Sequence, residues 1–317
     1  MLRDPLINSM DRINDAEMMC EDHIIPFNVL RFEQRINEGS YGIVFKGRYI
    51  NAPVAIKRIK TDEIMTHEFM HEVKVLKSLR HPNIVLFMGV CVTKDSNFIL
   101  TEFMAGGSLE DCIYLHERKS PSPIHECMPF KKKIRLLLEV VLGMTYLHSM
   151  NPPLCHRDLK PSNILLDLNH NTAKVCDFGT AKHLQHMSMT GTVGTLVYMS
   201  PEILISDRHY DESCDVYSFS ICMYELFFEV RPYTNIDVTF FLSENESTSE
   251  YDFGNLFNLG FQVMNGARPA IPNVALNDAE RDYVDLMVRC WDTKPKNRPR
   301  FDEIFACMEK IQNKIKE

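Results

Sequence analysis

The spacing of apolar residues along the chain changes at Gly106. Before it, short runs of β-branched and aromatic residues recur, as is typical of strands. We expect strands over residues 30–36, 43–49, 54–59, 86–92 and 97–102. Residues 64–79 interrupt these runs with the spacing of a helix.

After Gly106, apolar residues recur every three or four positions, which predicts helices with one face in a core. Three such faces are Ile134, Leu137, Leu138, Val141 and Leu142; Tyr283, Leu286, Met287 and Cys290; and Phe301, Ile304, Phe305 and Met308. The pattern predicts an α+β fold with a strand-rich lobe at 27–104 and a larger helical lobe at 105–314. Residues 1–26 read as an extension or linker, and the polar stretches 116–129 and 234–252 as surface loops.

Composition narrows the class of protein. A chain of 317 residues with 45% hydrophobic and 25% charged residues is ordinary for a globular protein of two lobes. The net charge of -8 argues against a general nucleic-acid binder, which needs clustered Lys and Arg. Ten Cys without Cys-x-x-Cys pairs suggest reduced thiols and a cytoplasmic location. The apolar stretch 136–147 contains Glu139 and has helical spacing, so we expect a buried helix and no membrane segment.

One short motif indicates the chemistry. Residues 156–163 read His-Arg-Asp-Leu-Lys-Pro-Ser-Asn, and Asp-Phe-Gly follows at 177–179. Asp158 can accept a proton from an attacking hydroxyl, and Lys160 can neutralise charge on a phosphate. Asn163 and Asp177 offer the hard oxygens that Mg²⁺ prefers, with Mn²⁺ as an alternative. The set predicts phosphoryl transfer.

A glycine-containing turn between two predicted strands could hold phosphates. It comprises Ile36, Asn37, Glu38, Gly39, Ser40, Tyr41, Gly42, Ile43 and Val44. Gly39 and Gly42 would let backbone N–H groups approach phosphate oxygens, although a tight hairpin would use the same glycines. Val-Ala-Ile-Lys at 54–57 follows on the next strand and favours the phosphate-binding interpretation.

These motifs, in this order along almost the whole chain, resemble those of the eukaryotic protein kinases. The resemblance implies the bilobal kinase fold and ATP as cofactor. It implies that Lys57 contacts the α- and β-phosphates and pairs with Glu72, with Glu68 as the competing carboxylate. The remaining implied site residues are Val44, Ala55 and Leu165 around the purine, Thr101 as gatekeeper, Glu102 and Met104 in the hinge, and Thr195 in substrate docking. The apolar ones among them could equally be ordinary core residues.

The resemblance also assigns supporting and regulatory residues. Asp215 would tie down the backbone of the catalytic loop, or serve simply as a helix cap, and Glu202 with Arg298 would form a buried ion pair. Ser188, Thr190 and Thr192 are candidate phosphorylation sites, with Thr190 or Thr192 preferred. Arg157 would pair with the phosphate, which an upstream kinase or the protein itself in trans would attach. A constitutively ordered loop is the competing interpretation.

The resemblance is closest to the tyrosine-kinase-like group, relatives of Raf and mixed-lineage kinases. Cys-Trp-Asp-Thr-Lys-Pro at 290–295 and His-Pro-Asn-Ile-Val at 81–85 carry it. Lys160, two residues after Asp158, favours serine and threonine residues of protein substrates in signalling, and dual specificity stays open. A pseudokinase scaffold and a small-molecule kinase are the two competing classes of protein. The first would lack Lys57, Asp158 or Asp177, and the second would lack Ser-Pro-Glu at 200–202.

Overall fold

The computed structural model describes residues 23–39, 42–60, 63–94, 96–114, 128–183, 193–205, 210–234 and 253–315. The chain divides into two compact units, one ending at Ala105 and the other beginning at Gly106. Each unit has its own core, and each is described by itself below. The extent of the predicted domain, residues 27–314, stays a prediction.

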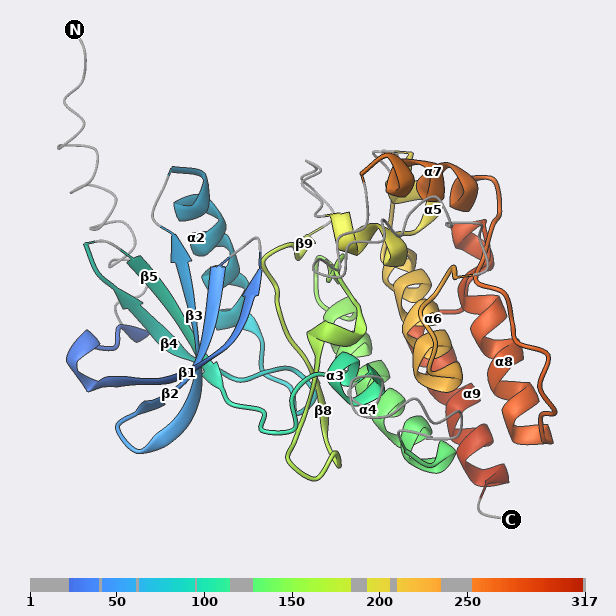
Figure 1. Cartoon of the computed structure of the whole chain (residues 1–317), viewed down its shortest axis with the longest axis horizontal. Coiled ribbons are helices and arrows are strands. Elements are labelled where there is room, and N and C mark those ends of the chain that lie inside the picture. Colours follow the sequence, from blue (N-terminus) through green and yellow to red (C-terminus); the bar gives the residue numbers. More distant parts are fainter. Residues whose placement is uncertain are drawn as a thin grey trace, which may run out of the picture. The chain divides into compact units, whose positions relative to one another are not determined.

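The first unit is built on an antiparallel sheet of five strands with the spatial order β1-β2-β3-β5-β4. The strands are β1 (Leu30–Gly39), β2 (Gly42–Tyr49), β3 (Ala52–Lys60), β4 (Phe87–Val92) and β5 (Ser96–Glu102). Helix α2 (Glu63–Ser78) packs against this sheet, as Figure 1 shows. All five predicted strands and the predicted helix are therefore present, and the α+β interpretation is confirmed.

The edge strand β1 departs from the alternation that the sequence suggests. Its pairing with β2 shifts between Phe32 and Gln34 and again between Arg35 and Asn37. Each irregularity moves the following side chains to the other face of the sheet. Leu30 and Phe32 precede both shifts and lie on one face, where Leu30 is buried and Phe32 is exposed. Ile36 follows the first shift and is exposed.

The first unit also includes residues that the sequence assigned to an extension. Ile25 is buried, and its N–H donates to the carbonyl of Val90 at 2.7 Å. Gly89 has φ +155°, and a Cβ there would lie 2.6 Å from Ile25 Cδ1 and 2.7 Å from the carbonyl oxygen of His23. Only glycine allows this close approach, so the 23–26 segment packs on β4 before the short helix η2 (Phe27–Val29) begins.

The second unit is mainly helical. Its long helices are α4 (Phe130–His148), α6 (Ser213–Phe228), α7 (Phe253–Met264), α8 (Asp278–Cys290) and α9 (Phe301–Lys314). Its shorter elements are α3 (Leu109–Tyr114), α5 (Pro201–Leu204), η3 (Pro161–Asn163), η4 (Val193–Tyr198), η5 (Pro295–Asn297), β6 (Leu154–Cys155), β7 (Ile164–Leu166), β8 (Ala173–Val175) and β9 (Lys182–His183). In Figure 1, α4, α6, α8 and α9 lie side by side, and α5 and α7 lie together at one end of them.

The predicted helical faces account for most of this packing. Ile134, Leu137 and Val141 are buried on α4, whereas Leu142 at the edge of the same stripe is exposed. Helix α8 begins at a capping box in which Asn277 and Glu280 each accept from the other's backbone N–H. Helix α6 is apolar on nearly all sides, and 13 of its residues are buried, so it forms the centre of the second unit.

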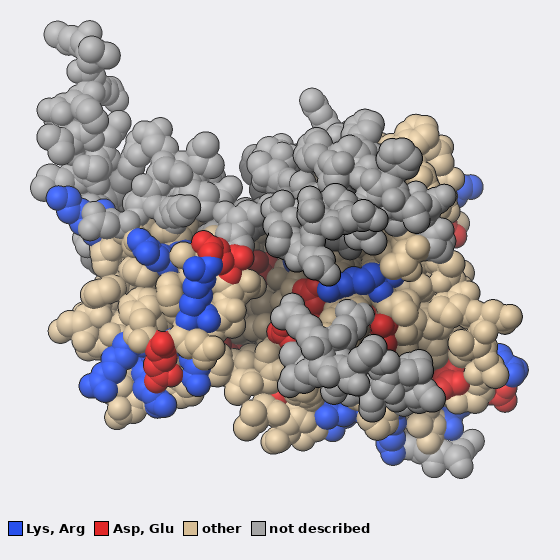
Figure 2. Space-filling model, in the orientation of Figure 1, with Lys and Arg blue, Asp and Glu red and all other residues tan. Residues whose placement is uncertain are grey.

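Two surface properties bear on partners. No helix in the described part of the chain is long and apolar enough to cross a membrane. On the face drawn in Figure 2, basic and acidic side chains of the described residues are interspersed, and neither sign forms a continuous patch. This mixture gives no support to nucleic-acid binding by that face.

Candidate active site

Four of the predicted nucleotide-binding residues lie on one face of the first unit's sheet. Val44 of β2 pairs with Lys57 of β3, and Ala55 of β3 pairs with Thr101 of β5. Directly paired residues point to the same side of a sheet, and so do residues two apart on one strand. The register therefore brings Val44, Ala55, Lys57 and Thr101 together on a single surface.

Lys57 is held by Glu72 of α2. The Lys57 Nζ atom lies 2.9 Å from both carboxylate oxygens of Glu72, which is the ion pair that the sequence predicts. The side chains are only 16% and 6% exposed, so the pair is largely shielded from solvent. Two charge-assisted bonds fix the direction of the ammonium group along the sheet.

The ends of the glycine turn and of the predicted hinge are also defined. Gly42 has φ +141°, and a Cβ there would lie 2.1 Å from the carbonyl oxygen of Arg58, so the hairpin requires glycine. Ser40 and Tyr41 lie outside the described residues. The carboxylate of Glu102 accepts from the N–H of Leu86 at 2.7 Å, which anchors the end of β5 just before the buried Met104.

In the second unit, Asp158 is a buried carboxylate whose two oxygens differ in their hydrogen bonding. Its Oδ2 lies 2.8 Å from Lys160 Nζ and accepts from Asn163 Nδ2 at 3.0 Å. Its Oδ1 is buried and has no hydrogen-bond partner among the described residues. An unpaired buried carboxylate oxygen is costly unless a ligand supplies a donor.

The oxygens of Asn163 and Asp177 suit a divalent cation. The amide nitrogen of Asn163 donates to the backbone carbonyl and to Oδ2 of Asp158. The amide carbonyl oxygen of Asn163 can therefore bind another partner. The N–H of Cys176 donates to the backbone carbonyl of Asn163 at 3.0 Å, so Cys176 lies opposite Asn163 just beyond the β7–β8 ladder, and Asp177 follows it in the chain. A carboxylate and an amide oxygen form a donor set that fits Mg²⁺.

The backbone of this loop is fixed by Asp215 at the start of α6. The Asp215 carboxylate accepts from the N–H groups of His156 and Arg157, both at 2.8 Å, and lies 2.9 Å from His148 Nε2. Burial alone would raise the pKa of Asp215, but the bond to His148 and the donors around it hold that pKa below its ordinary value. Asp215 is therefore an ionised anchor, the tie that the sequence predicts.

Two residues of the loop region have left-handed backbone angles. Arg157 has φ +68° and Asp177 has φ +62°. Each such conformation in a non-glycine residue costs roughly 1–3 kcal/mol and persists only where surrounding contacts enforce it. The Asp215 bond to the Arg157 N–H supplies one such contact. His156 supplies others, since its ring lies 2.9 Å from the carbonyl of Cys176 and packs on Phe178.

Arg157 is positioned to receive a further partner. Its Nη1 donates to the carbonyl of Thr180 at 3.3 Å, and the guanidinium lies over the ring of Tyr210. Its Nε is buried and has no partner among the described residues. Part of the hydrogen-bonding capacity of this guanidinium is therefore unused.

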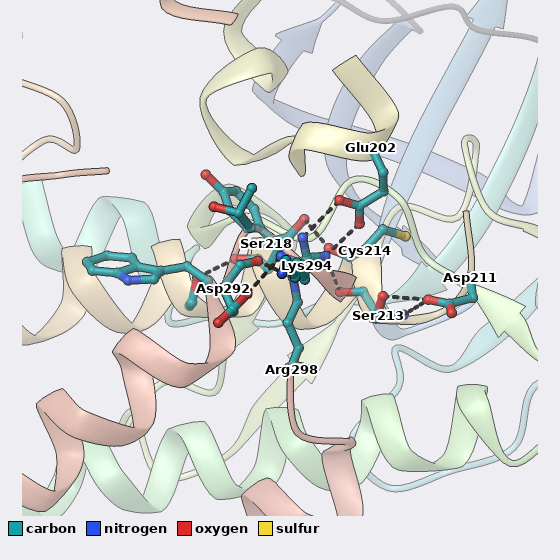
Figure 3. Close-up of polar contacts among 12 residues, drawn as sticks. Glu202, Asp211, Ser213, Cys214, Ser218, Asp292, Lys294 and Arg298 are labelled. Carbon is teal, nitrogen blue, oxygen red and sulfur yellow. Dashed lines mark hydrogen bonds and ion pairs between the residues drawn. The ribbon is translucent and has the colours of Figure 1, made fainter. Parts of the chain in front are cut away.

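Figure 3 shows the ion pair between Glu202 and Arg298, and both residues are buried. The two guanidinium nitrogens of Arg298 lie 2.5 and 2.8 Å from the two carboxylate oxygens of Glu202. Arg298 also donates to the backbone carbonyls of Ser213 and Asp292. This network joins α5, the first residue of α6 and the turn before α9, so it supports the platform that carries Asp215.

The remaining predicted site residues have mixed outcomes. Leu165 is half-buried in β7, opposite Ser108 in an antiparallel bridge. Thr195 belongs to η4, but its side chain is outside the described part. The candidate phosphorylation sites Ser188, Thr190 and Thr192 also lie outside the described residues. The roles assigned to all these residues stay predictions.

The sequence interpretation missed one polar cluster close to the site. Glu225 is fully buried in α6, and its carboxylate accepts from the hydroxyls of Tyr114 at 2.6 Å and Tyr198 at 2.7 Å. The signal in the sequence is a carboxylate in the apolar second half of the helix. Its partners are 111 and 27 residues away, so the pattern does not identify them.

Comparison with known proteins agrees with this arrangement. A sequence model of the protein kinase domain matches residues 30–308. A protein of Acanthamoeba polyphaga mimivirus named as a serine/threonine-protein kinase/receptor is 35% identical over 285 residues. The Arabidopsis thaliana protein SIS8, named as a probable serine/threonine-protein kinase, is 33% identical over 310 residues. The Dictyostelium discoideum dual specificity protein kinase shkC is 33% identical over 289 residues.

These similarities cover most of this chain but less of the relatives. They include 89%, 96% and 89% of this chain, and 15%, 26% and 51% of the respective relatives. The chain thus spans at most about half the length of these relatives.

Proposed function

The chain belongs to the protein kinase domain family, and from that premise we propose that it transfers the γ-phosphate of ATP to serine or threonine hydroxyls of protein substrates. The observation that carries this proposal is the buried Asp158, whose Oδ2 is held by Lys160 and Asn163 and whose Oδ1 has no partner within the described part of the chain. A substrate hydroxyl is the donor that Oδ1 lacks.

Asp158 would act by orienting that hydroxyl and accepting its proton. Because Oδ2 is already engaged, the carboxylate cannot rotate freely, and Oδ1 points in one direction. Lys160, 2.8 Å from Asp158, would neutralise charge that develops on the transferred phosphate. Asn163 and Asp177 would hold Mg²⁺, which supplies charge neutralisation for the phosphate oxygens.

The first unit would bind the nucleotide. Lys57 is already directed by Glu72, so it can contact phosphate oxygens without first being ordered. Val44 and Ala55 on the same sheet face would contact the purine, and the main chain near Glu102 would recognise its polar edge. In this proposal, Glu72 acts only through Lys57.

Serine/threonine specificity is the preferred form of this proposal. It rests on Lys160 two residues after Asp158 and on Thr195 before Ser-Pro-Glu. The name of shkC keeps dual specificity open. The motifs at 81–85 and 290–295 favour membership of the tyrosine-kinase-like group.

Regulation by phosphorylation of Thr190 or Thr192 forms part of the proposal. Arg157 supports it, because its buried Nε lacks a partner among the described residues and a phosphate would supply an acceptor. An upstream kinase, or a second copy acting in trans, would attach the phosphate. Mapping of phosphorylated residues in the active protein should find one in this segment, and active protein without one would contradict this part.

Transfer of radiolabelled phosphate from ATP to a generic basic protein tests the function. Wild type should label the substrate in the presence of Mg²⁺, and Asp158→Asn and Asp177→Ala should not. Phosphoamino-acid analysis of the product distinguishes serine and threonine from tyrosine. Labelling that survives Asp158→Asn would reject the role of Asp158, and a wild type without transfer would favour a pseudokinase.

A further inference from the structure

Glu225 joins three separate segments of the second unit. It lies on α6, its Oε1 accepts from Tyr114 of α3, and its Oε2 accepts from Tyr198 of η4. Tyr198 is also held at its backbone, because the hydroxyl of Ser218 on α6 donates to its carbonyl at 2.8 Å. One helix therefore fixes both ends of Tyr198, which ends the segment that carries Thr195.

The charge of this cluster depends on Glu225. Glu110 of α3 lies 2.8 Å from Arg231, whose guanidinium stacks 3.8 Å above the ring of Tyr114. Other titratable or charged groups lie around this part of α6. They are Cys222 and Tyr224 on α6, Tyr283 on α8, and the ion pair between Lys133 on α4 and Glu229, the residue that follows α6. Glu110 and Arg231 neutralise one another, so an ionised Glu225 leaves one net negative charge among these three residues.

Protonation of Glu225 changes how the tyrosines bind. Burial raises the pKa of Glu225 to about 7, against the opposing effect of the two tyrosine hydroxyls and Arg231. Burial and the neighbouring Glu225 also raise the pKa of Tyr198 well above its ordinary value, so its hydroxyl remains a donor. An ionised Glu225 accepts two charge-assisted bonds. A protonated one must donate to one tyrosine oxygen, which leaves neutral and weaker bonds.

We propose that Glu225 is a positioning residue for the kinase reaction, which in its ionised form holds the Val193–Tyr198 segment in the geometry that binds protein substrate. The role rests on the proposed function, since Thr195 in this segment is the residue predicted to dock the substrate. Glu225 acts through Tyr198 and contacts no reacting atom. Protonation loosens the segment and weakens substrate binding as the pH falls.

Stability provides a readout that does not depend on activity. The folded protein binds the Glu225 proton more tightly than the unfolded chain, because the pKa rises from 4.5 to about 7 on folding. The contribution of this proton to stability is full below the unfolded value and is lost as the pH rises through about 7. Glu225→Gln carries no such proton. The melting temperature of wild type minus that of Glu225→Gln should therefore fall as the pH rises from 4.5 to about 7.

The test compares kcat and KM for a protein substrate between about pH 6 and pH 8 in wild type and three variants. Glu225→Gln has the shape of the protonated residue and should keep the low-pH KM throughout. At the acidic end of the range, its kcat/KM should match that of wild type. At the basic end, its kcat/KM should be roughly fivefold lower because its KM is higher, as expected when one hydrogen bond loses its charge assistance. Ser218→Ala loosens the same tyrosine without a titrating group, so its deficit should not vary with pH. The exposed Glu309→Gln makes the same charge change elsewhere and should follow wild type.

The outcomes are distinguishable. A kcat/KM ratio of wild type to Glu225→Gln that stays constant over this pH range would overturn the positioning role. A melting-temperature difference that stays flat would overturn the titration itself. A wild type without phosphate transfer would reject the proposed function, and the positioning role with it, even where the stability curve still shows the titration.

Discussion

Loss of the buried arginine at position 298 should destabilise the second unit severely. Arg298 is 6% exposed and makes two bonds to Glu202 and two to the backbone carbonyls of Ser213 and Asp292. Arg298→Ala leaves the Glu202 carboxylate buried without a counter-charge. Removing one partner of such a pair costs roughly 3–5 kcal/mol. For a unit of this size the melting temperature should fall by roughly 6–20 °C.

A second variant and a control separate the charge effect from other causes. Glu202→Gln keeps the side-chain volume and still offers an oxygen acceptor to Arg298, so it should cost less than Arg298→Ala. Arg300→Ala removes an arginine two positions away whose side chain is 77% exposed and whose ion pair with Asp302 is long, at 3.3 Å. Exposed pairs contribute about 0–1 kcal/mol, so this variant should melt close to wild type.

Urea unfolding monitored by circular dichroism measures these differences directly. The order of the free energies of unfolding should be wild type close to Arg300→Ala, then Glu202→Gln, then Arg298→Ala. Equal stability of Arg298→Ala and Arg300→Ala would refute the reasoning, because burial would then not determine the cost. The slope of the unfolding transition should be unchanged in all three variants, which checks that the comparison is two-state.

Three further predictions follow from buried polar atoms. Ser200→Ala should raise the free energy of unfolding by about 1 kcal/mol, because the Ser200 hydroxyl is fully buried and has no partner among the described residues; a lower melting temperature would contradict this. Glu72→Gln should slow phosphate transfer by roughly ten- to a hundredfold while shifting the melting temperature little, since it loosens Lys57 without opening a cavity. A large drop in melting temperature beside the loss of activity would indicate a structural role. Tyr217→Phe and Tyr233→Phe each leave one buried hydroxyl without its 2.9 Å partner, so each should lower the free energy of unfolding by about 1–3 kcal/mol. The double variant should lose less than the sum of the two single variants, and strict additivity would mean that the hydroxyls do not interact.

Local patterns predict the strands of the first unit well because runs of β-branched and aromatic residues recur along it. The register of β2 with β3 and of β3 with β5 is regular, so alternation along the sequence corresponds to alternation in space. Alternation does not predict burial in β1, because Ile36 follows a register shift and Phe32 is exposed although it precedes both shifts. It also fails at Ile25, whose burial depends on the absence of a side chain at Gly89.

In the second unit, the long amphipathic helices are visible in the sequence and the short elements are not. Strands of two or three residues, such as β6 and β8, are too short to show a period. Helix α7 is apolar but follows a long polar stretch, and the sequence interpretation included no helix there. Strand β6 pairs with β9, and α7 packs against α5, so these two elements depend on segments that a local window does not contain. Strand β8 pairs with the nearby β7, but both strands are too short to show a period.

The candidate site divides in the same way. The site residues Asp158, Lys160 and Asn163 are predictable because they lie close together in the sequence and their side chains suit one reaction, phosphoryl transfer. The ion pair of Lys57 with Glu72 is predictable from the resemblance to protein kinases, because the predicted helix alone also offers Glu68. Glu225 is not predictable, because the hydroxyls that bind it come from two separate segments.

Helix α6 explains why the polar residues that escape sequence patterns still matter for the site. An apolar helix at the centre of a unit can carry a polar side chain only if a neighbouring segment satisfies its hydrogen bonds. On α6, Asp215 is satisfied by the catalytic loop, Ser218 by the Tyr198 carbonyl, and Glu225 by two tyrosine hydroxyls. Each of these three positions is therefore also a connection between the core and a segment of the site. Isosteric changes at these three positions should disturb function before stability, since they release one segment and leave the apolar packing of the helix in place.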